Sequence, residues 1–180
     1  SLVAPISGAL GAVRTMLAGG NGAAFGDSGH AETNDNLIEM GAPDPVAATA
    51  ILSASAVGDM VNDTTLAIID TAGTTHTFTL KTGNDSTAGN NVGIQTAKAT
   101  GGVAGNEAAA AQFVAAINAG TCAATITAAV VAGTDGILLT QDVAGASGNR
   151  AITNGIAGLT APASFTLGAD AGPSTLAIVN

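Results

Sequence analysis

The sequence predicts an α+β fold, rich in strands, in which one helix packs on a small and largely antiparallel sheet. Two segments, residues 65–81 and 124–141, alternate apolar and polar side chains on either side of a short turn, which is typical of β-hairpins. Between them, apolar residues recur at helical spacing in residues 107–118. The resulting order of strand, strand, helix, strand, strand indicates a helix that covers one face of a sheet.

Residues 1–60 are predicted to form an N-terminal arm of extended chain and loops with a short helix. Apolar residues at helical spacing, followed by two glycines, indicate this helix within residues 6–17. No basic segment precedes it and glycines interrupt it, so we do not interpret it as a signal peptide. Residues 21–45 read mostly as loop, with one short strand at Leu37–Met40. Such a long, weakly patterned stretch more often reaches a neighbouring subunit than fills a compact domain.

Residues 61–180 are predicted to form the folded module. Its first hairpin consists of a strand at 65–70, a turn at 71–74 and a strand at 75–81. In the second strand, His76, Phe78 and Leu80 share one face and the threonines and Lys81 share the other. A polar loop at 82–91 and an extended piece at 92–97 follow.

The predicted helix spans residues 107–118, with Asn106 as its N-cap and Gly120 at its end. The residues that form its apolar stripe are Ala110, Phe113, Val114 and Ile117. Strands at 124–131 and 136–141, joined by a turn at 132–135, form the second hairpin. One or more C-terminal strands complete the module.

Composition limits the core and excludes several classes of partner. Ala, Gly and Thr supply 88 of the 180 residues, and only 44 larger apolar side chains remain. So thin a core predicts elongated or oligomeric packing. The chain has four Lys and Arg and 13 Asp and Glu, which gives a net charge of −9. Four cations cannot form a basic surface that binds nucleic acid or an anionic membrane. No apolar run approaches the roughly 20 residues of a membrane span.

No residue pattern predicts a catalytic, cofactor or metal site. His76 lies on an apolar strand face, so we expect a core or interface histidine with a polar partner. His30, near Asp27 and Glu32, is expected to be a solvated loop residue. Ser53 and Ser55 have no His–Asp arrangement that would make either a nucleophile. Cys122, the single cysteine, is expected to be buried and unreactive.

Two further patterns are better explained by local structure than by ligands. Acidic and amide residues cluster at 34–36, 62–63, 84–85 and 135, but without the ligand spacing of a calcium loop, and Asx-turns account for them. The glycine-rich segment 101–105 lacks the Lys-Ser/Thr pair of a phosphate-binding loop and is interpreted as a flexible connection.

Four blocks in order resemble a module that recurs, often in tandem, in structural proteins of tailed bacteriophages, especially marine ones. The first has the form D-x-x-G-x-x-x-x-F, from Asp70 to Phe78, and the second A-x-x-F-x-x-A-I-N, from Ala110 to Asn118. The third is I-T-A at 126–128, and the fourth is L-T-Q-x-x-x-G-x-x-G-N, from Leu139 to Asn149. The resemblance covers residues 64–155, about half of the chain.

The resemblance implies a non-enzymatic virion protein. A small acidic chain with a single module and an extended arm favours a capsid decoration or cement protein that bridges capsomers. Its expected partners are the major capsid protein and copies of itself, as a homo-oligomer such as a trimer. It would be made in the host cytoplasm and located on the capsid surface. The alternatives are a tail-tube or fibre subunit and, in a different class, a secreted bacterial filament or adhesin domain.

Overall fold

The structure is a computed structural model that describes residues 37–40, 43–172 and 175–178. It divides into two units, one of residues 1–44 with 171–180 and a compact one of residues 45–170. In the first unit, β1 (Leu37–Met40) pairs antiparallel with β9 (Thr175–Ile178). The predicted strand at Leu37–Met40 is therefore confirmed, and its partner comes from the C-terminal end of the chain. The predicted helix within residues 6–17 lies outside the described residues.

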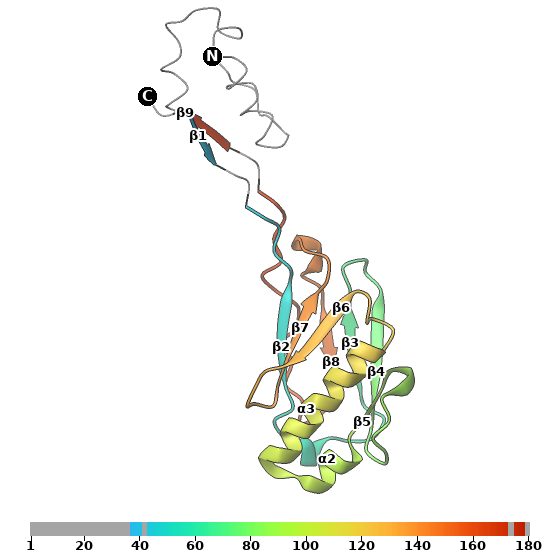
Figure 1. The fold of residues 1–180 in the computed structure, drawn as a ribbon. Helices are drawn as coiled ribbons and strands as arrows, with labels where there is room; N and C mark the ends of the chain where they lie inside the picture. The colour runs from blue at the N-terminus through green and yellow to red at the C-terminus, as the bar shows by residue number, and fades with distance from the viewer. Residues whose placement is uncertain (1–36, 41–42, 173–174, 179–180) are drawn as a thin grey trace, which may run out of the picture. The chain divides into compact units, whose positions relative to one another are not determined.

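The compact unit contains two sheets and one main helix (Figure 1). The three-stranded sheet has the order β2 (Thr49–Ser53), β7 (Gly136–Gln141), β6 (Ile126–Val130). The four-stranded sheet has the order β5 (Asn91–Gly93), β4 (Thr75–Lys81), β3 (Thr65–Ile69), β8 (Ile152–Asn154). All pairs are antiparallel except β4 with β5. The predicted α+β class is confirmed, with the strands distributed over two sheets instead of one.

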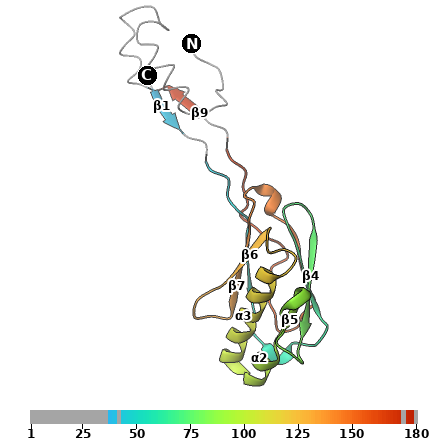
Figure 2. The same ribbon diagram turned by 45° about the vertical axis from the view of Figure 1, so that its right-hand side comes forward.

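The main helix, α3 (Gly102–Ala119), packs against β6, β7 and β5. Figure 2 shows it with β6 and β7 on one side and β5 on the other. Phe113 and Ile117 are fully buried and belong to one apolar core that both sheets share. Val114, expected in the same stripe, is only partly buried, and alanines 109 and 116 complete the buried face instead.

The first hairpin forms as its sequence predicts. His76, Phe78 and Leu80 are buried along β4, and Leu66 and Ile68 are buried along β3. The turn closes because Gly73 adopts a positive φ of 86°, a conformation that glycine reaches without steric cost.

Two predictions around the helix are wrong. Residues 94–97, expected to be extended, belong mostly to a short helix, α2 (Gln95–Thr100). The main helix begins at Gly102, five residues before Glu107, because Gly101 takes a φ of 62° and turns the chain from one helix into the next. Gly105 is required for this packing, since a Cβ there would lie 2.6 Å from the Ala97 carbonyl oxygen.

Asn106 is therefore not the helix N-cap. It lies in the first turns of α3, and its side chain binds the segment before a short 3-10 turn at Val57–Asp59. Its Oδ1 accepts a hydrogen bond from the Val57 N–H (3.0 Å), and its Nδ2 donates to the Ser55 carbonyl (2.8 Å). Asn106 thus links the start of α3 to the segment around Ser55 and Val57.

The expected boundary between residues 60 and 61 lies inside the compact unit. The unit begins at Pro45, and β2 is hydrogen-bonded along its length to β7. As a result β7, the second strand of the predicted hairpin, is the central strand of its sheet. The prediction missed β2 because alanines occupy two of its three inward positions, 48, 50 and 52, and Leu52 is the one large apolar residue among them.

One segment, residues 160–166, covers an edge strand of each sheet. Thr166 exchanges two backbone hydrogen bonds with Thr49 of β2, and Thr160 exchanges two with Ser53. Between these points, residues 163–165 pair with the start of β8 and the two residues before it. The Ala163 carbonyl accepts a hydrogen bond from the Ile152 N–H, and the Phe165 N–H donates to the Arg150 carbonyl. Edge strands expose backbone groups that can recruit another chain, so this segment both joins the sheets and protects their edges.

The other two edge strands, β6 and β5, also form hydrogen bonds on their outer sides with other parts of the compact unit. The outward N–H and C=O of Ala128, at the middle of β6, both bind the side-chain amide of Asn118 at 2.8 Å. At the end of β5, the Gly93 N–H donates to the Ser86 carbonyl (3.0 Å). All four edge strands of the compact unit therefore make hydrogen bonds on their outer side.

Candidate functional site

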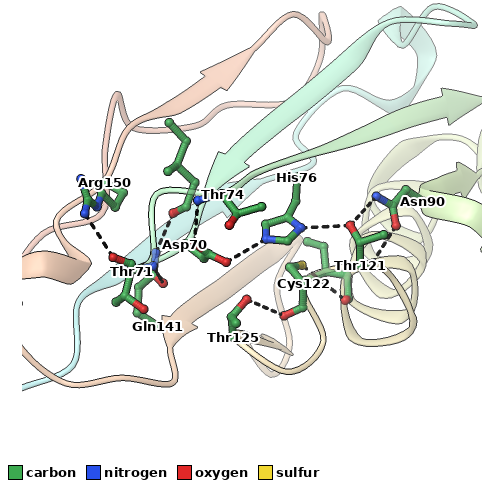
Figure 3. A network of polar contacts seen from close by, with 12 residues as sticks. Asp70, Thr71, Thr74, His76, Asn90, Thr121, Cys122, Thr125, Gln141 and Arg150 are labelled. Atoms are coloured by element: carbon green, nitrogen blue, oxygen red, sulfur yellow. Dashed lines mark hydrogen bonds and ion pairs between the residues drawn. The ribbon is translucent and has the colours of Figure 1, made fainter.

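A chain of buried and partly exposed polar side chains lies at the end of the first hairpin (Figure 3). The Asp70 carboxylate, directly after β3, is 3.0 Å from Nε2 of His76 on β4. Nδ1 of His76 is 3.0 Å from Oγ1 of Thr121, which follows α3. Thr121 also exchanges two hydrogen bonds of 2.9 Å with the Asn90 side chain. Asp70 and His76 are buried, whereas Thr121 is exposed.

The hydrogen bonds between these polar side chains pair donors with acceptors. An ionised carboxylate can only accept, so Nε2–H of His76 donates to Asp70. Nδ1 on the other side of the ring is hydrogen-bonded to the Thr121 hydroxyl, and Nδ2 of Asn90 donates to the Thr121 oxygen. Asp70 also accepts a hydrogen bond from the Thr74 N–H (2.8 Å).

The Asp70 carboxyl is the titratable group most affected by this environment. Burial by itself raises the pKa of Asp70, but the hydrogen bonds from His76 and Thr74 and the charge interaction with His76 outweigh it. The net pKa of Asp70 lies below its ordinary value of 3.8. The carboxylate is therefore ionised in the folded protein at neutral pH.

An aspartate, a histidine and a hydroxyl in series have the composition of a nucleophilic triad, which the sequence analysis did not identify. Nucleophilic catalysis also needs N–H donors for an oxyanion and a base that reaches the leaving group. Here the Thr121 N–H is bound to Asn90 and the Ala123 N–H to the Gly120 carbonyl. His76 is only 6% exposed. The arrangement connects β4, the end of α3 and the turn at Ala88–Asn90.

A second group of contacts ties the same hairpin to the other sheet. Gln141 at the end of β7 is fully buried, and its amide binds two backbone groups after β3. Its Oε1 accepts from the Thr71 N–H (3.1 Å), and its Nε2 donates to the Ile69 carbonyl (2.8 Å). Arg150 donates from Nη2 to the Thr71 carbonyl (3.1 Å). Gln141 therefore links the ends of β7 and β3, one in each sheet.

The two asparagines of the four blocks also bind backbone groups. Asn118 binds Ala128 of β6, as described above. Asn149 exchanges two hydrogen bonds, of 2.9 and 3.0 Å, with the backbone of Gly168. Gly148 is needed for close packing, since a Cβ there would lie 2.9 Å from the Ala48 Cβ. Asp70, Asn118, Gln141 and Asn149 thus all use their side chains within the fold.

The acidic and amide clusters in the described residues serve local structure. Asn84 forms the predicted Asx-turn, accepting from the Ser86 N–H (3.0 Å). Asp85 accepts from both the N–H and the hydroxyl of Thr96 in α2, and these bonds lower the pKa of Asp85. Asp63 pairs with Lys81. Among residues with described side chains, no group of three or more His, Cys, Asp or Glu lies close enough to hold a metal ion.

The other candidate residues are placed as follows. Cys122 is buried, as predicted, and burial raises the pKa of its thiol to about 11. Ser53 pairs through its backbone with Thr160, and the Ser55 carbonyl is bound by Asn106. His30, Asp27, Glu32 and the cluster at 34–36 lie outside the described residues.

Sequence reasoning found His76 and the need for a partner but did not identify the partner. A short turn at 71–74 places Asp70 and His76 near each other across a hairpin, so this contact could have been predicted from the sequence. Thr121, Asn90 and Gln141 come from distant elements, and no local pattern marks their contacts with the hairpin.

Within the part of the chain that the structure describes, no helix has the length and apolar character needed to cross a bilayer. No family model matches the sequence, and neither the curated proteins nor the solved structures contain a significant match.

Proposed function

We propose that this chain is a non-enzymatic structural protein of a tailed-phage virion, most specifically a decoration or cement protein on the capsid surface. The supporting observation is how four of the six polar residues in the phage-like blocks are used. Asp70, Asn118, Gln141 and Asn149 each bind backbone groups of the same chain. A pattern of residues that maintains a fold fits a protein that acts by contact.

The proposed partners are the major capsid protein and further copies of this chain. The acidic composition, with a net charge of −9, makes the packaged nucleic acid an unfavourable partner and favours the outside of the shell. A tail-tube or fibre subunit remains the second candidate, because the resemblance extends to several virion components.

Addition of the purified full chain to phage heads that lack it tests the proposal. Binding should saturate at a fixed ratio to the major capsid protein, and decorated heads should release their genome at a higher temperature than bare heads. A full-chain His76→Gln variant that is folded by circular dichroism should bind equally well, because contact requires no general base. Failure of the wild-type chain to bind heads, or saturation only on tails, would contradict the cement assignment.

A further inference from the structure

The β2–β7–β6 sheet has an exposed face whose six central side chains carry no charge. Its outward positions form two rows across the strands, Thr49–Thr140–Thr127 and Ile51–Leu138–Ala129. We call these six residues the outer face. Their neighbours along each strand, such as Leu52, Leu139 and Ala128, point into the core and are buried. The outer face is thus the side of the sheet opposite the core.

Ile51 is the most prominent apolar group of the outer face. It lies on β2 with 63% of its surface exposed, beside the partly buried Leu138. Ile51 on the edge strand and Leu138 on the central strand are directly opposite each other, and covering this pair would remove apolar surface from water. Because the edge strands are already bonded on their outer sides, a partner would approach this face instead of extending the sheet.

The charge distribution along the chain indicates which partner fits. All 13 acidic residues lie between positions 27 and 170, whereas residues 1–26 contain none and carry a single cation, Arg14. The same 26 residues include Leu2, Ile6, Leu10 and Val13. Two other stretches of similar length, 108–134 and 143–169, also lack Asp and Glu, but both lie inside the compact unit. Residues 1–26 are therefore the long uncharged-to-basic stretch that lies outside it. At one end of the outer face lies Asp142, an exposed carboxylate that accepts a hydrogen bond from Thr127 (2.7 Å) and offers a partner for a cation.

We propose that the outer face binds residues 1–26 of a second copy of this chain. Residues 27–44 join that segment to the compact unit and would span about 60 Å if fully extended. This reach exceeds the roughly 30–35 Å diameter of a domain of this size, so the segment can reach a neighbouring copy. If every copy donates one segment and accepts one, two copies can exchange segments about a two-fold axis, or more copies can form a ring when the rotation between neighbours closes. The proposal concerns contact between copies, so its test is separate from that of the virion assignment.

Photo-crosslinking on the full chain tests the contact directly. Benzoylphenylalanine replaces Ile51 in an isotopically light chain, which is mixed with unsubstituted heavy chain, irradiated and analysed by mass spectrometry. Light–heavy crosslinks from position 51 to peptides of residues 1–26 are expected. The matched control carries the crosslinker at Val103, an apolar residue on α3 that is 74% exposed, and should give no enrichment of these peptides. Crosslinks confined to one chain, crosslinks only to another part of the second copy, or none would each overturn the proposal.

Sedimentation of full-chain variants provides an independent measurement. Ile51→Asp should weaken self-association by at least about tenfold, because it places a charge at the centre of the contact. Val103→Asp adds the same charge elsewhere and should leave association unchanged. Circular dichroism verifies that both variants are folded. Equal association of the two variants would overturn the proposal.

Discussion

At the level of single residues, buried polar side chains determine how the two sheets meet. Gln141 spans from β7 to the end of β3 through two hydrogen bonds, and Asp70 and His76 continue the connection towards α3. A buried polar group is tolerated when its hydrogen bonds are satisfied and is costly when one partner is removed. These residues should therefore be sensitive to truncation.

Gln141→Ala tests the connection between the sheets. The substitution leaves the Thr71 N–H and the Ile69 carbonyl without their partner, and we expect a loss of about 2–5 kcal/mol in the free energy of unfolding. Gln95→Ala, the same change at an exposed position in α2, should alter stability by less than about 0.5 kcal/mol. Urea unfolding at neutral pH measures both, and equal effects would show that Gln141 does not hold the sheets.

Asp70 gives the fold a pH dependence of defined sign. Its pKa is lower in the folded chain than the ordinary 3.8, so its stabilising contribution is complete above the unfolded pKa and is lost as the pH falls through the folded pKa. The difference in unfolding free energy between wild type and Asp70→Asn should be constant above about pH 5 and shrink at lower pH. Urea unfolding from pH 7 to pH 2.5 measures it. A difference that grows as the pH falls would contradict the assignment.

At the level of elements, α3 carries much of a core that has few large side chains. Phe113 and Ile117 of the helix and Phe78, Ile126 and Leu139 of the strands are fully buried in one cluster. Small residues allow close approach around them, as Gly105 does against α2. Loss of one large side chain therefore removes a substantial part of the core.

Phe113→Ala should cost about 3–5 kcal/mol, a large share of the 5–15 kcal/mol typical of a domain. Val103→Ala on the same helix changes an exposed side chain and should cost less than about 1 kcal/mol. Thermal and urea unfolding of the full chain compare the two. A Phe113→Ala chain that unfolds like wild type would show that α3 is not central to the core.

The elements that could be predicted are those with large apolar residues at a clear period. β3 and β4 alternate fully, and the end of α3 follows Phe113 and Ile117. By contrast β2 and α2 are built mainly from small or polar residues, whose pattern resembles a loop. The buried network was only partly predictable, because Thr121 and Gln141 reach the hairpin through tertiary packing.

At the level of the whole molecule, the chain enters and leaves the compact unit at adjacent points. Val46 and Ala169 form an antiparallel bridge of two backbone hydrogen bonds, of 2.8 and 3.1 Å. A unit with neighbouring ends can be presented by a larger assembly without disturbing its core. This arrangement is consistent with the capsid-surface role that we propose.

Electron cryo-microscopy of purified particles of the phage proposed to encode this chain tests the virion assignment most directly. The account predicts density for the compact unit on the outside of the head, repeated with the icosahedral symmetry of the shell. Density confined to a helical tail or an isolated fibre would move the chain to the second candidate function. Particles that lack the chain altogether would contradict the account.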